Sequence, residues 1–370
     1  MKRRGFVGKL GAAGVGLAGA ATLSGCGENS TDDLMANPLE EKVSWKMVTS
    51  WPKNFPGLGR APETLAEYVA DMTNGNFTIQ VYGAGEFVPA LEVFDAVSQG
   101  TVAMGHSSAY YWKGKLPAAP FFTSVPFGLT AQEMNGWLSY GGGLTLWRSL
   151  YQPFNLIPFP GGNTGVQMAG WFNKPINSIE DIKGMKMRIP GLAGEVWKAL
   201  GGVPVTLAGS EIFTALQTGA IDATEWVGPY NDLAFGLHKA AKYYYYPGWH
   251  EPGATLEFIV NKGVFETLPE PYQKILEVGM RAVNQLMLDE YTARNHAALE
   301  ELINEHGVDV RPMPESVLKA LQVASEDVVK NVSQTNDLAE RIYQSYLSFQ
   351  RHSQSYHSLS ELAYMQAREA

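Results

Sequence analysis

An arginine at the end of a predicted strand is the residue of this chain that is best suited to bind a charged ligand. Arg188 lies within the run Met185-Lys-Met-Arg-Ile189, which alternates as a strand does and is ended by Pro190. A guanidinium at a strand end can meet a carboxylate with two parallel hydrogen bonds, a geometry that a lysine ammonium does not offer. The pattern therefore indicates recognition of a small carboxylic acid. The alternative is a structural arginine paired with an acidic residue of the chain.

A carboxylate at a second strand end is the next such group. Glu225 directly follows the stretch 220–224, which is typical of a buried strand. A carboxylate that leaves water requires a partner, because burial without one is strongly unfavourable. Two partners satisfy this requirement: an ion pair with Arg188 in the absence of a metal, or a hard cation bound through oxygen atoms.

Aromatic side chains follow another predicted strand by a few residues. Tyr110, Tyr111 and Trp112 form this group, in a chain with 9 Trp, 17 Tyr and 16 Phe. Such side chains fill cores and also line clefts for small molecules. We expect Tyr111 to close over a ligand and to donate a hydrogen bond to it, with simple packing as the alternative. Trp51 and Phe55 have weaker support as residues of the same cleft.

Support for catalysis is slight. The chain contains no His-Glu-x-x-His zinc motif, no Gly-x-Ser-x-Gly nucleophile motif and no phosphate-binding loop. The segment Gly161-Gly-Asn-Thr-Gly165 lacks the spacing of a dinucleotide-binding loop. None of the 7 histidines forms a pair with the spacing of metal ligands. An exported enzyme that uses Glu225 and a metal stays open as an alternative to a binding protein.

A repeated pattern indicates which elements position these groups. The segment Phe94-x-Ala-Val-x-x-Gly-x-Val102 recurs at a constant offset as Phe213-x-Ala-Leu-x-x-Gly-x-Ile221. Each copy predicts a helix end, a glycine stop and a buried strand, and each strand runs into polar or aromatic residues. Since ligands of α/β proteins bind at the carboxyl ends of strands and between domains, the pattern favours two similar lobes facing a cleft. The alternative is that helix–glycine–strand units are common in any α/β protein.

The last third of the chain is predicted to be helical. Residues 272–305 contain one glycine and no proline, with apolar residues at helical spacing. A helix of about 34 residues would span about 50 Å, because each residue adds 1.5 Å. It is therefore kinked, braces both lobes, or reaches a second subunit. Three further helices are predicted at 315–332, 337–351 and 359–369. The strands that precede this region alternate with helices, so we expect mostly parallel sheets.

The N-terminus is typical of an export signal. The basic segment Lys2–Lys9 precedes a short, weakly apolar run, too short for a spanning helix of about 20 apolar residues. Leu23-Ser-Gly-Cys26 then resembles a bacterial lipobox, and Cys26 is the only cysteine. We expect lipidation of Cys26, with a chance cysteine in an ordinary signal peptide as the alternative. Arg3-Arg4-x-Phe-Val resembles a twin-arginine signal.

Composition and charge exclude several classes of protein. The 370 residues are 45% hydrophobic and 18% charged, which is typical of a globular chain. The formal net charge is −9, and removal of the first 25 residues with their four basic side chains takes it to −13. A basic surface for nucleic acid is not expected. A single cysteine excludes an internal disulfide and cysteine-rich zinc sites.

One run of residues carries a resemblance to a known family. Asn173-Lys-Pro175, followed by Asp181-Ile-Lys-Gly-Met-Lys-Met-Arg188, closely resembles the solute-binding subunits (DctP family) of tripartite ATP-independent periplasmic (TRAP) transporters. In that family this run carries an arginine that grips the ligand carboxylate. The similarity covers most of the mature chain and includes the segments 50–52, 99–100 and 217–222.

The resemblance implies a fold and a domain organisation. The implied fold is an α/β, two-lobed periplasmic binding protein with an interdomain cleft and long C-terminal helices. The domain boundaries that we expect are a signal peptide at 1–25, a flexible tether at 26–41, lobe 1 at 42–160, lobe 2 with crossover strands at 161–262, and a helical region at 263–370 that braces the lobes. In similar keto-acid binders the long helix is exchanged between subunits, so a homodimer is expected.

The resemblance also implies a metal and its ligands. Glu225, Trp226 and Gln167 resemble the branch that binds 2-oxo acids or lactate with sodium or calcium. The implied metal ligands are the Glu225 carboxylate, the Gln167 side-chain oxygen and the Trp226 main-chain carbonyl, with Glu251 as an additional ligand. The implied substrate-binding residues are Gln167, Arg188, Tyr111 and Trp226. A 2-oxo or 2-hydroxy acid would chelate the cation through neighbouring oxygens.

The expected function is capture of a small 2-oxo or 2-hydroxy acid in the periplasm by a membrane-tethered lipoprotein. Closure of the lobes would precede delivery to a membrane permease. A metal-assisted enzyme, a C4-dicarboxylate binder without metal and a ligand sensor on the same fold are the alternatives. Turnover distinguishes the enzyme, cation dependence distinguishes the dicarboxylate binder, and the partner protein distinguishes the sensor.

Overall fold

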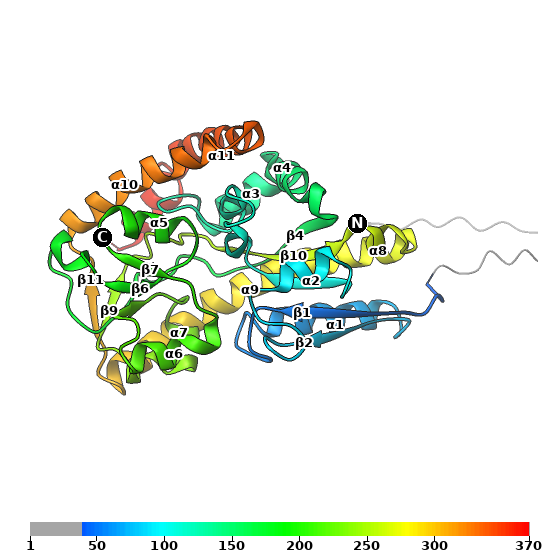
Figure 1. The fold of residues 1–370 in the computed structure, drawn as a ribbon, viewed down its shortest axis with the longest axis horizontal. Helices are drawn as coiled ribbons and strands as arrows, with labels where there is room; N and C mark the ends of the chain where they lie inside the picture. The colour runs from blue at the N-terminus through cyan, green and yellow to red at the C-terminus, as the bar shows by residue number, and fades with distance from the viewer. Residues whose placement is uncertain (1–38, 370) are drawn as a thin grey trace, which may run out of the picture. The chain divides into compact units, whose positions relative to one another are not determined.

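The computed structural model describes residues 39–369, which form a mixed α/β structure with two β-sheets (Figure 1). The export signal, the twin-arginine pattern and Cys26 lie outside the described residues. In the described part of the chain, no helix has the length and apolar character needed to cross a membrane.

The first sheet has five strands in the order β2-β1-β3-β10-β4. Alternating apolar and polar residues give β2 one buried face and one exposed face, as its sequence predicts. The strands are β1 Val43–Thr49, β2 Phe77–Tyr82, β3 Met104–Ser107, β4 Leu156–Asn163 and β10 Thr255–Asn261. The helices and turns in this part of the chain are α1 Arg60–Met72, α2 Val93–Ser98, η1 Ala109–Trp112, η2 Ala119–Phe122, α3 Ala131–Tyr140, α4 Gly143–Tyr151, η3 Gln152–Phe154 and α8 Lys262–Glu266.

The second sheet has six short strands in the order β11-β9-β5-β8-β6-β7. They are β5 Gly170–Phe172, β6 Lys186–Arg188, β7 Val203–Val205, β8 Ala223–Thr224, β9 Tyr243–Tyr246 and β11 Asp309–Pro312. The connecting helices and turns are η4 Ile179–Ile182, α5 Gly191–Ala199, α6 Gly209–Gln217, α7 Pro229–Phe235 and η5 Leu237–Lys239.

Strand direction agrees only in part with the expectation of mostly parallel sheets, since five of the nine strand pairings in the described residues are parallel and four are antiparallel. In the first sheet, β10 runs antiparallel to both β3 and β4. In the second, β5 runs antiparallel to β8 and β9. In the first sheet the reason is the path of the chain: β10 returns to this sheet after β5 to β9 of the second, so the segment 161–262 supplies strands to both sheets.

The internal repeat has the expected local structure. Gly100 follows α2 and Gly219 follows α6, and both adopt left-handed conformations, with φ of 74° and 75°. Glycine adopts this conformation without the steric penalty of a side chain and so ends a helix. The helix of the first copy is short, because α2 begins only at Val93.

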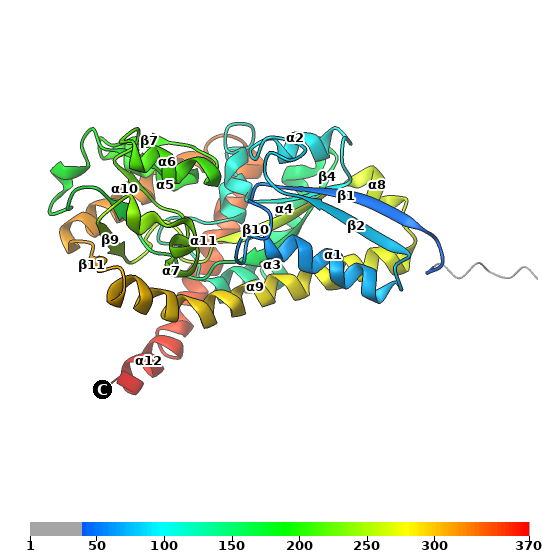
Figure 2. The same cartoon turned by 90° about the horizontal axis from the view of Figure 1, so that it is seen from below.

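Long helices form the C-terminal third of the chain, as expected. They are α9 Glu270–Asn304, α10 Glu315–Ser333, α11 Asp337–His357 and α12 Glu361–Glu369. Helix α9 has 35 residues and contacts β4 and α1 next to the first sheet and α7 next to the second (Figure 2). It therefore braces both halves of its own chain.

Three clusters of buried apolar side chains hold this arrangement. One joins the face of the first sheet under α1 and α9 to α6 and α7 of the second half. Another lies between the first sheet's other face and helices α3, α4 and α11, and the third lies between the second sheet, α5 and α10. The clusters extend across both sheets, which fixes the ends of the strands that carry the candidate site.

The first described residues are attached to the folded body. The main-chain carbonyls of Leu39 and Glu41 accept hydrogen bonds of 2.8 and 2.7 Å from the Tyr272 hydroxyl on α9. The Leu39 carbonyl also accepts a bond from Asn76, in the turn before β2. These residues were expected to be the last of the tether, and they lie against the body instead.

Candidate functional site

Two neighbouring parallel strands bring Arg188 and Glu225 together. Arg188 is the last residue of β6 and is paired in register with Thr224, the last residue of β8. The Glu225 amide donates to the Arg188 main-chain carbonyl at 3.2 Å. Because parallel strands end at the same edge of a sheet, both side chains start from one place. Neither has measurable exposure to solvent.

The Arg188 guanidinium is held on all sides. Its Nη1 forms an ion pair with the Glu225 carboxylate and also donates to the Glu225 main-chain carbonyl at 3.3 Å. Its Nε donates to the Leu207 carbonyl at 3.3 Å, and its Nη2 donates to the Tyr111 hydroxyl at 3.1 Å. Burial opposes the charge, but the pKa of Arg188 is raised because the attraction of Glu225, Tyr111, Tyr110 and Glu251 together outweighs burial.

Tyr111 reaches this guanidinium from the other half of the molecule. It lies in η1, directly after β3 of the first sheet, whereas Arg188 belongs to the second sheet. Burial is the main reason that the pKa of Tyr111 is raised, so its hydroxyl stays protonated. Since the oxygen accepts from Arg188, the hydroxyl proton is available for a ligand.

Gln167 and Glu251 form a second buried pair beside the first. The Gln167 amide nitrogen donates to Glu251 Oε2 at 2.8 Å and to Thr164 Oγ1 at 3.0 Å. Both hydrogens of the amide are therefore used, which directs the amide oxygen to the other side. The main chains are also joined, because the Gln167 amide donates to the Glu251 carbonyl at 3.1 Å.

The two pairs meet around a set of oxygen and nitrogen atoms. Atoms of Glu225, His250 and Glu251 that could bind a metal all lie within 4.8 Å of one another. These three residues are the one group of this kind in residues 39–369. His250 Nε2 lies 3.5 Å from Glu225 Oε2. Burial first, and then the neighbouring charge of Glu225, raises the pKa of Glu251 well above its usual range.

Two buried oxygens of this group lack a hydrogen-bond partner among the described residues. They are Gln167 Oε1 and Glu225 Oε2, and both ring nitrogens of His250 share this property. Buried polar atoms are nearly always satisfied in folded proteins, so unsatisfied ones require an explanation. Carboxylate and amide oxygens are the ligands that sodium and calcium prefer, so these residues fit the implied cation.

Trp226 contacts Arg188 through its ring. The guanidinium carbon lies 5.3 Å from the centre of the Trp226 ring, within the range of a cation–π contact. Trp51 and Phe55, from the loop after β1, pack on the same ring at 6.1 and 6.3 Å. The two weaker candidates for the cleft thus reach the site through Trp226.

Trp51 is in turn fixed by a buried histidine. Its Nε1 donates to His106 Nδ1 at 2.8 Å, and His106 Nε2 donates to the Gly161 carbonyl at 2.9 Å. Burial lowers the pKa of His106 to about 4, so its ring is neutral near pH 7. One tautomer satisfies both contacts, which makes His106 a structural link between β3 and β4 and not a site residue.

Sequence reasoning located most of this site and missed His250. The structure brings Glu225, Tyr111 and Trp226 into contact with Arg188, and the ion pair of Arg188 with Glu225 is the alternative that the sequence left open. His250 escaped notice because histidines were considered only as pairs with each other. Its signal was its position next to Glu251, in a run of large side chains that ends at a proline.

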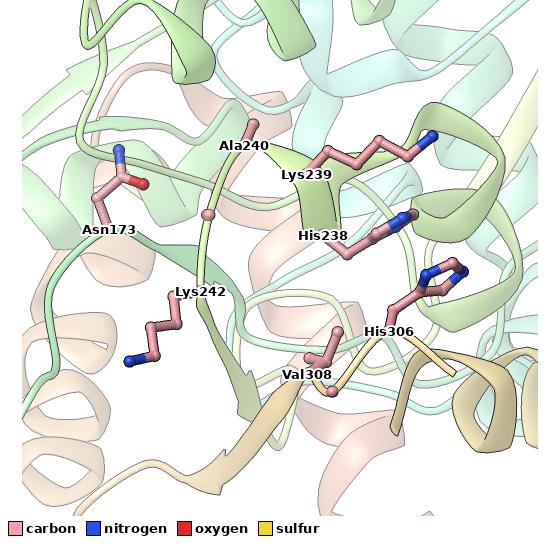
Figure 3. A pocket seen from close by; sticks show the side chains of 9 residues that line it. Asn173, His238, Lys239, Ala240, Lys242, His306 and Val308 are labelled. Atoms are coloured by element: carbon pink, nitrogen blue, oxygen red, sulfur yellow. The ribbon is translucent and has the colours of Figure 1, made fainter. Parts of the chain in front are cut away.

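A recess elsewhere in the molecule contains none of the expected site residues (Figure 3). It has a volume of about 330 Å³ and lies where η5 meets the turn after α9. The rings of His238 and His306 stack there with their centres 4.1 Å apart. The group formed by Arg188 and Glu225 therefore stands apart from this recess.

Two sheets joined by a long helix, with a buried guanidinium where their elements meet, define the class of two-lobed solute-binding proteins. The chain belongs to the bacterial extracellular solute-binding proteins, family 7 (DctP), whose family model matches residues 47–336. It is 44% identical over 364 residues to a monocarboxylate 2-oxoacid-binding periplasmic protein of Nostoc sp., covering 98% of each chain.

Solved structures of TRAP periplasmic solute-binding proteins resemble it closely. One from Pseudoalteromonas atlantica, with bound sodium and pyruvate, is 41% identical with a TM-score of 0.86 and covers 88% of this chain and 99% of its own. One from Colwellia psychrerythraea, with bound calcium and pyruvate, has the same identity and TM-score and covers 88% of this chain and 100% of its own. A third from Bordetella bronchiseptica, a mixed-occupancy dimer with calcium and picolinate, is 38% identical with a TM-score of 0.87, covering 89% of this chain and 97% of its own.

Proposed function

We propose that this chain is the extracytoplasmic solute-binding subunit of a TRAP transporter. It captures a small monocarboxylic 2-oxo acid of the pyruvate type, or a 2-hydroxy acid such as lactate, together with Na⁺ or Ca²⁺. It then delivers the acid to the membrane permease. Membership of the DctP family and the ligands of the similar structures support this assignment.

The observation that carries the proposal is the pair of unsatisfied oxygens, Gln167 Oε1 and Glu225 Oε2. They belong to a buried group in which Glu225 and Glu251 provide two carboxyls against one guanidinium, Arg188. A cation bound by Glu225, Gln167 and the Trp226 main-chain carbonyl, with Glu251 alongside, would satisfy the oxygens and reduce the repulsion between the carboxyls.

Arg188 and Tyr111 would receive the carboxylate of the acid. The guanidinium has five N–H donors, and its contacts use the Nε hydrogen, both Nη1 hydrogens and one Nη2 hydrogen. The remaining Nη2 hydrogen and the Tyr111 hydroxyl proton come from adjacent atoms. They form a two-donor receptor for one carboxylate, with Gln167 and Trp226 beside it.

The cation would select for the substituent next to the carboxylate. A 2-oxo or 2-hydroxy acid places a second oxygen where it completes a five-membered chelate, and a simple fatty acid does not. A C4-dicarboxylate would bring a second negative charge to a group that already contains Glu225 and Glu251. Like charges at short range oppose each other strongly when buried, so a monocarboxylate is favoured.

An exported enzyme is the second candidate, because Glu225 and a bound cation could act on an acid. Its support is limited to that chemistry, and the relatives described above are binding proteins by name. The distinguishing measurement is recovery of the ligand: a binding protein returns pyruvate unchanged after prolonged incubation with calcium, and any product would contradict the transport assignment.

The proposed location is the periplasm, with a lipid attached to Cys26 as the membrane tether. The proposed export route is the twin-arginine pathway, read from Arg3 and Arg4. We retain lobes at 42–160 and 161–262 and a helical region at 263–370 as proposed domains. The two-sheet arrangement supports two lobes, although β10 places the end of the second range in the first sheet.

The proposed homodimer rests on α12 and not on exchange of α9. Helix α9 packs along its own chain, whereas α12 projects from the body and has no buried residue (Figure 2). Leu359, Leu362, Tyr364 and Met365 are each at least half exposed. An apolar helix face of this kind is typical of an interface, and a second copy of the chain is its proposed occupant.

The test of the proposed function is a thermal-shift series on protein stripped of bound ligand. Pyruvate, longer 2-oxo acids, lactate and C4-dicarboxylates are added with and without sodium or calcium. A ligand at 100 times its Kd stabilises the fold by about 2.7 kcal/mol. We expect a shift that requires both a 2-oxo or 2-hydroxy acid and a cation. A shift from dicarboxylates alone would remove the metal from the proposal, and no shift with any acid would remove the substrate class.

A further inference from the structure

Behind the candidate site, a buried carboxylate links the loop after β8 to two strands of the second sheet. Asp232, on α7, is 1% exposed. Its Oδ1 accepts a hydrogen bond of 3.2 Å from the Val227 main-chain amide. Its Oδ2 accepts bonds of 2.9 Å from Trp171 Nε1 and 2.7 Å from the Tyr244 hydroxyl. The function proposed above assigns no role to this group.

The bond to Val227 fixes the direction of the preceding carbonyl. The peptide between Trp226 and Val227 is trans, since the one cis peptide in the described residues joins Tyr246 and Pro247. In a trans peptide the N–H and the C=O point in opposite directions. With the Val227 amide directed at Asp232, the Trp226 carbonyl is directed away from it.

That carbonyl is also available to bind. No hydrogen bond to the Trp226 carbonyl occurs within the part of the chain that the structure describes. The carbonyl of the residue before it, Glu225, is by contrast occupied by the Thr224 hydroxyl and by Arg188. The oxygen of Trp226 thus lacks an internal partner, as a main-chain cation ligand does before its cation binds.

The anchor behind Asp232 is rigid. Trp171 on β5 and Tyr244 on β9 are paired in register, and their rings stack with centres 4.0 Å apart and planes 17° from parallel. The following peptide is fixed as well, because the Met168 amide donates to the Val227 carbonyl at 3.1 Å. A loop held by groups on a sheet keeps its geometry better than a free loop does.

We infer that Asp232 is a positioning residue that holds the Trp226 carbonyl toward the cation before the cation and the acid arrive. It acts through the Val227 amide and touches neither ligand. The inference rests on the proposed function, because it requires a cation at Glu225, Gln167 and Trp226. Partners of this kind behind a metal site set ligand direction, and their loss weakens metal binding about 10- to 100-fold.

The variant Asp232→Asn tests this inference. Asparagine has one acceptor oxygen, so it cannot serve the Val227 amide on one side and Trp171 and Tyr244 on the other. We expect the calcium concentration that half-saturates pyruvate binding to rise about tenfold or more, with pyruvate affinity recovering at saturating calcium. The readout is calorimetric titration of pyruvate at a series of calcium concentrations, with a thermal melt of each protein.

Asp222→Asn is the matched control. Asp222 also accepts a main-chain hydrogen bond in this sheet, from the Lys186 amide at 2.9 Å, but it is not attached to the Trp226 peptide. This variant is expected to keep the wild-type calcium dependence. If Asp232→Asn keeps it too, or loses pyruvate affinity equally at every calcium concentration, the inference is overturned. Cation-independent binding by the wild-type protein would instead overturn the proposed function.

A second measurement covers the case in which Asp232→Asn does not fold. Amide-resolved hydrogen exchange on the ligand-free wild-type protein reports directly on the Val227 amide. We expect strong protection before any cation is added, because the bond to Asp232 exists without ligand. Rapid exchange that becomes slow on addition of calcium and pyruvate would show that the ligands, and not Asp232, orient the peptide.

Discussion

Arg188 has two roles, and a substitution that removes its side chain affects both of them at once. It is the expected receptor for a carboxylate, and it also neutralises the fully buried Glu225. Removing one member of a buried ion pair leaves an uncompensated charge and destabilises a protein by about 3–5 kcal/mol. The variant Arg188→Ala is therefore expected to lose stability together with binding.

The variant Arg188→Lys separates the two tasks. A lysine retains a positive charge for Glu225, but its compact ammonium cannot replace the planar guanidinium contacts and also keep the Nη2 donor that lies beside the Tyr111 hydroxyl. We expect pyruvate to bind about 10- to 100-fold more weakly, since hydrogen bonds to charged groups contribute about 1.5–3 kcal/mol each. Calorimetric titration at saturating calcium measures this change.

Arg311→Lys is the control for this prediction. Arg311 lies on the edge strand β11 of the same sheet, where it pairs with Asp309, and the side chain is 38% exposed. Its replacement is expected to leave pyruvate affinity unchanged. Wild-type affinity in Arg188→Lys would contradict the role of the Arg188 guanidinium as a donor to the carboxylate of the acid.

At the residue scale, the sequence predicts functional side chains that follow a strand, but it does not predict side chains whose partners come from distant segments. Arg188 and Glu225 could be predicted because each follows a recognisable strand. Asp232 could not, because its three hydrogen-bond donors come from three different elements. Partners that are distant in sequence leave no spacing that a motif search can detect.

At the element scale, β10 carries a buried acid that joins it to two other elements. Glu257 accepts hydrogen bonds from Trp112 Nε1, in η1, at 2.5 Å and from the Tyr151 hydroxyl, in α4, at 2.8 Å. Burial raises its pKa from 4.5 to about 7, and the two hydrogen bonds oppose this shift only in part. The stability of the junction between β10, η1 and α4 should therefore depend on pH.

The direction in which pH changes the stability follows from the protonation of Glu257 in the folded and in the unfolded chain. Between pH 4.5 and about 7 the unfolded chain has released the Glu257 proton while the folded chain retains it. Raising the pH therefore favours unfolding in this range and has no further effect above it. The free energy of unfolding is expected to fall by about 3 kcal/mol from this group.

The variant Glu257→Gln isolates that contribution. Glutamine keeps the shape and has no proton to release, so the difference in unfolding free energy between variant and wild type should change by about 3 kcal/mol between pH 4.5 and 7.5. Urea unfolding at several pH values measures it. A difference that is constant across this range would show that Glu257 does not titrate as described.

Element type was predicted well from the sequence, and strand order was not. The strands predicted in 185–189 and 220–224 and the helix predicted over 272–305 all correspond to elements of the structure. The position of β10 between β3 and β4 depends on contacts across long stretches of chain, and local patterns hold no information about it. The expectation of mostly parallel sheets was wrong in part for this reason.

At the scale of the whole molecule, α12 supplies a prediction about assembly. Deletion of residues 359–370 removes Leu359, Leu362, Tyr364 and Met365, all of which are exposed, and no side chain of α12 is buried in the body. We expect the truncated protein to be a monomer by light scattering, with the affinity for pyruvate and the melting temperature of the body retained.

A dimer that survives this deletion would place the interface elsewhere, and a full-length protein that is monomeric at every concentration would remove the dimer. The double variant Glu361→Gln/Arg368→Gln is a control, because it changes two charges on α12 and keeps its apolar residues. It is expected to remain dimeric.

Attachment to the membrane gives a second prediction at this scale. Cys26 is the only cysteine of the chain, so one substitution, Cys26→Ser, removes any thioether-linked lipid. The variant is expected to move from the detergent phase to the aqueous phase in a two-phase detergent extraction of whole cells. Equal partition of the variant and the wild type would contradict lipidation at this residue.

The order of strands in the first sheet has a consequence for how the protein is made. Strands β3 and β4 are complete once residue 163 has been synthesised, but the strand that joins them, β10, begins at residue 255. Since synthesis adds about 5–20 residues per second, several seconds pass between the completion of β4 and the appearance of β10. The first sheet is therefore completed late and from distant parts of the chain, and long-range pairing of this kind folds slowly.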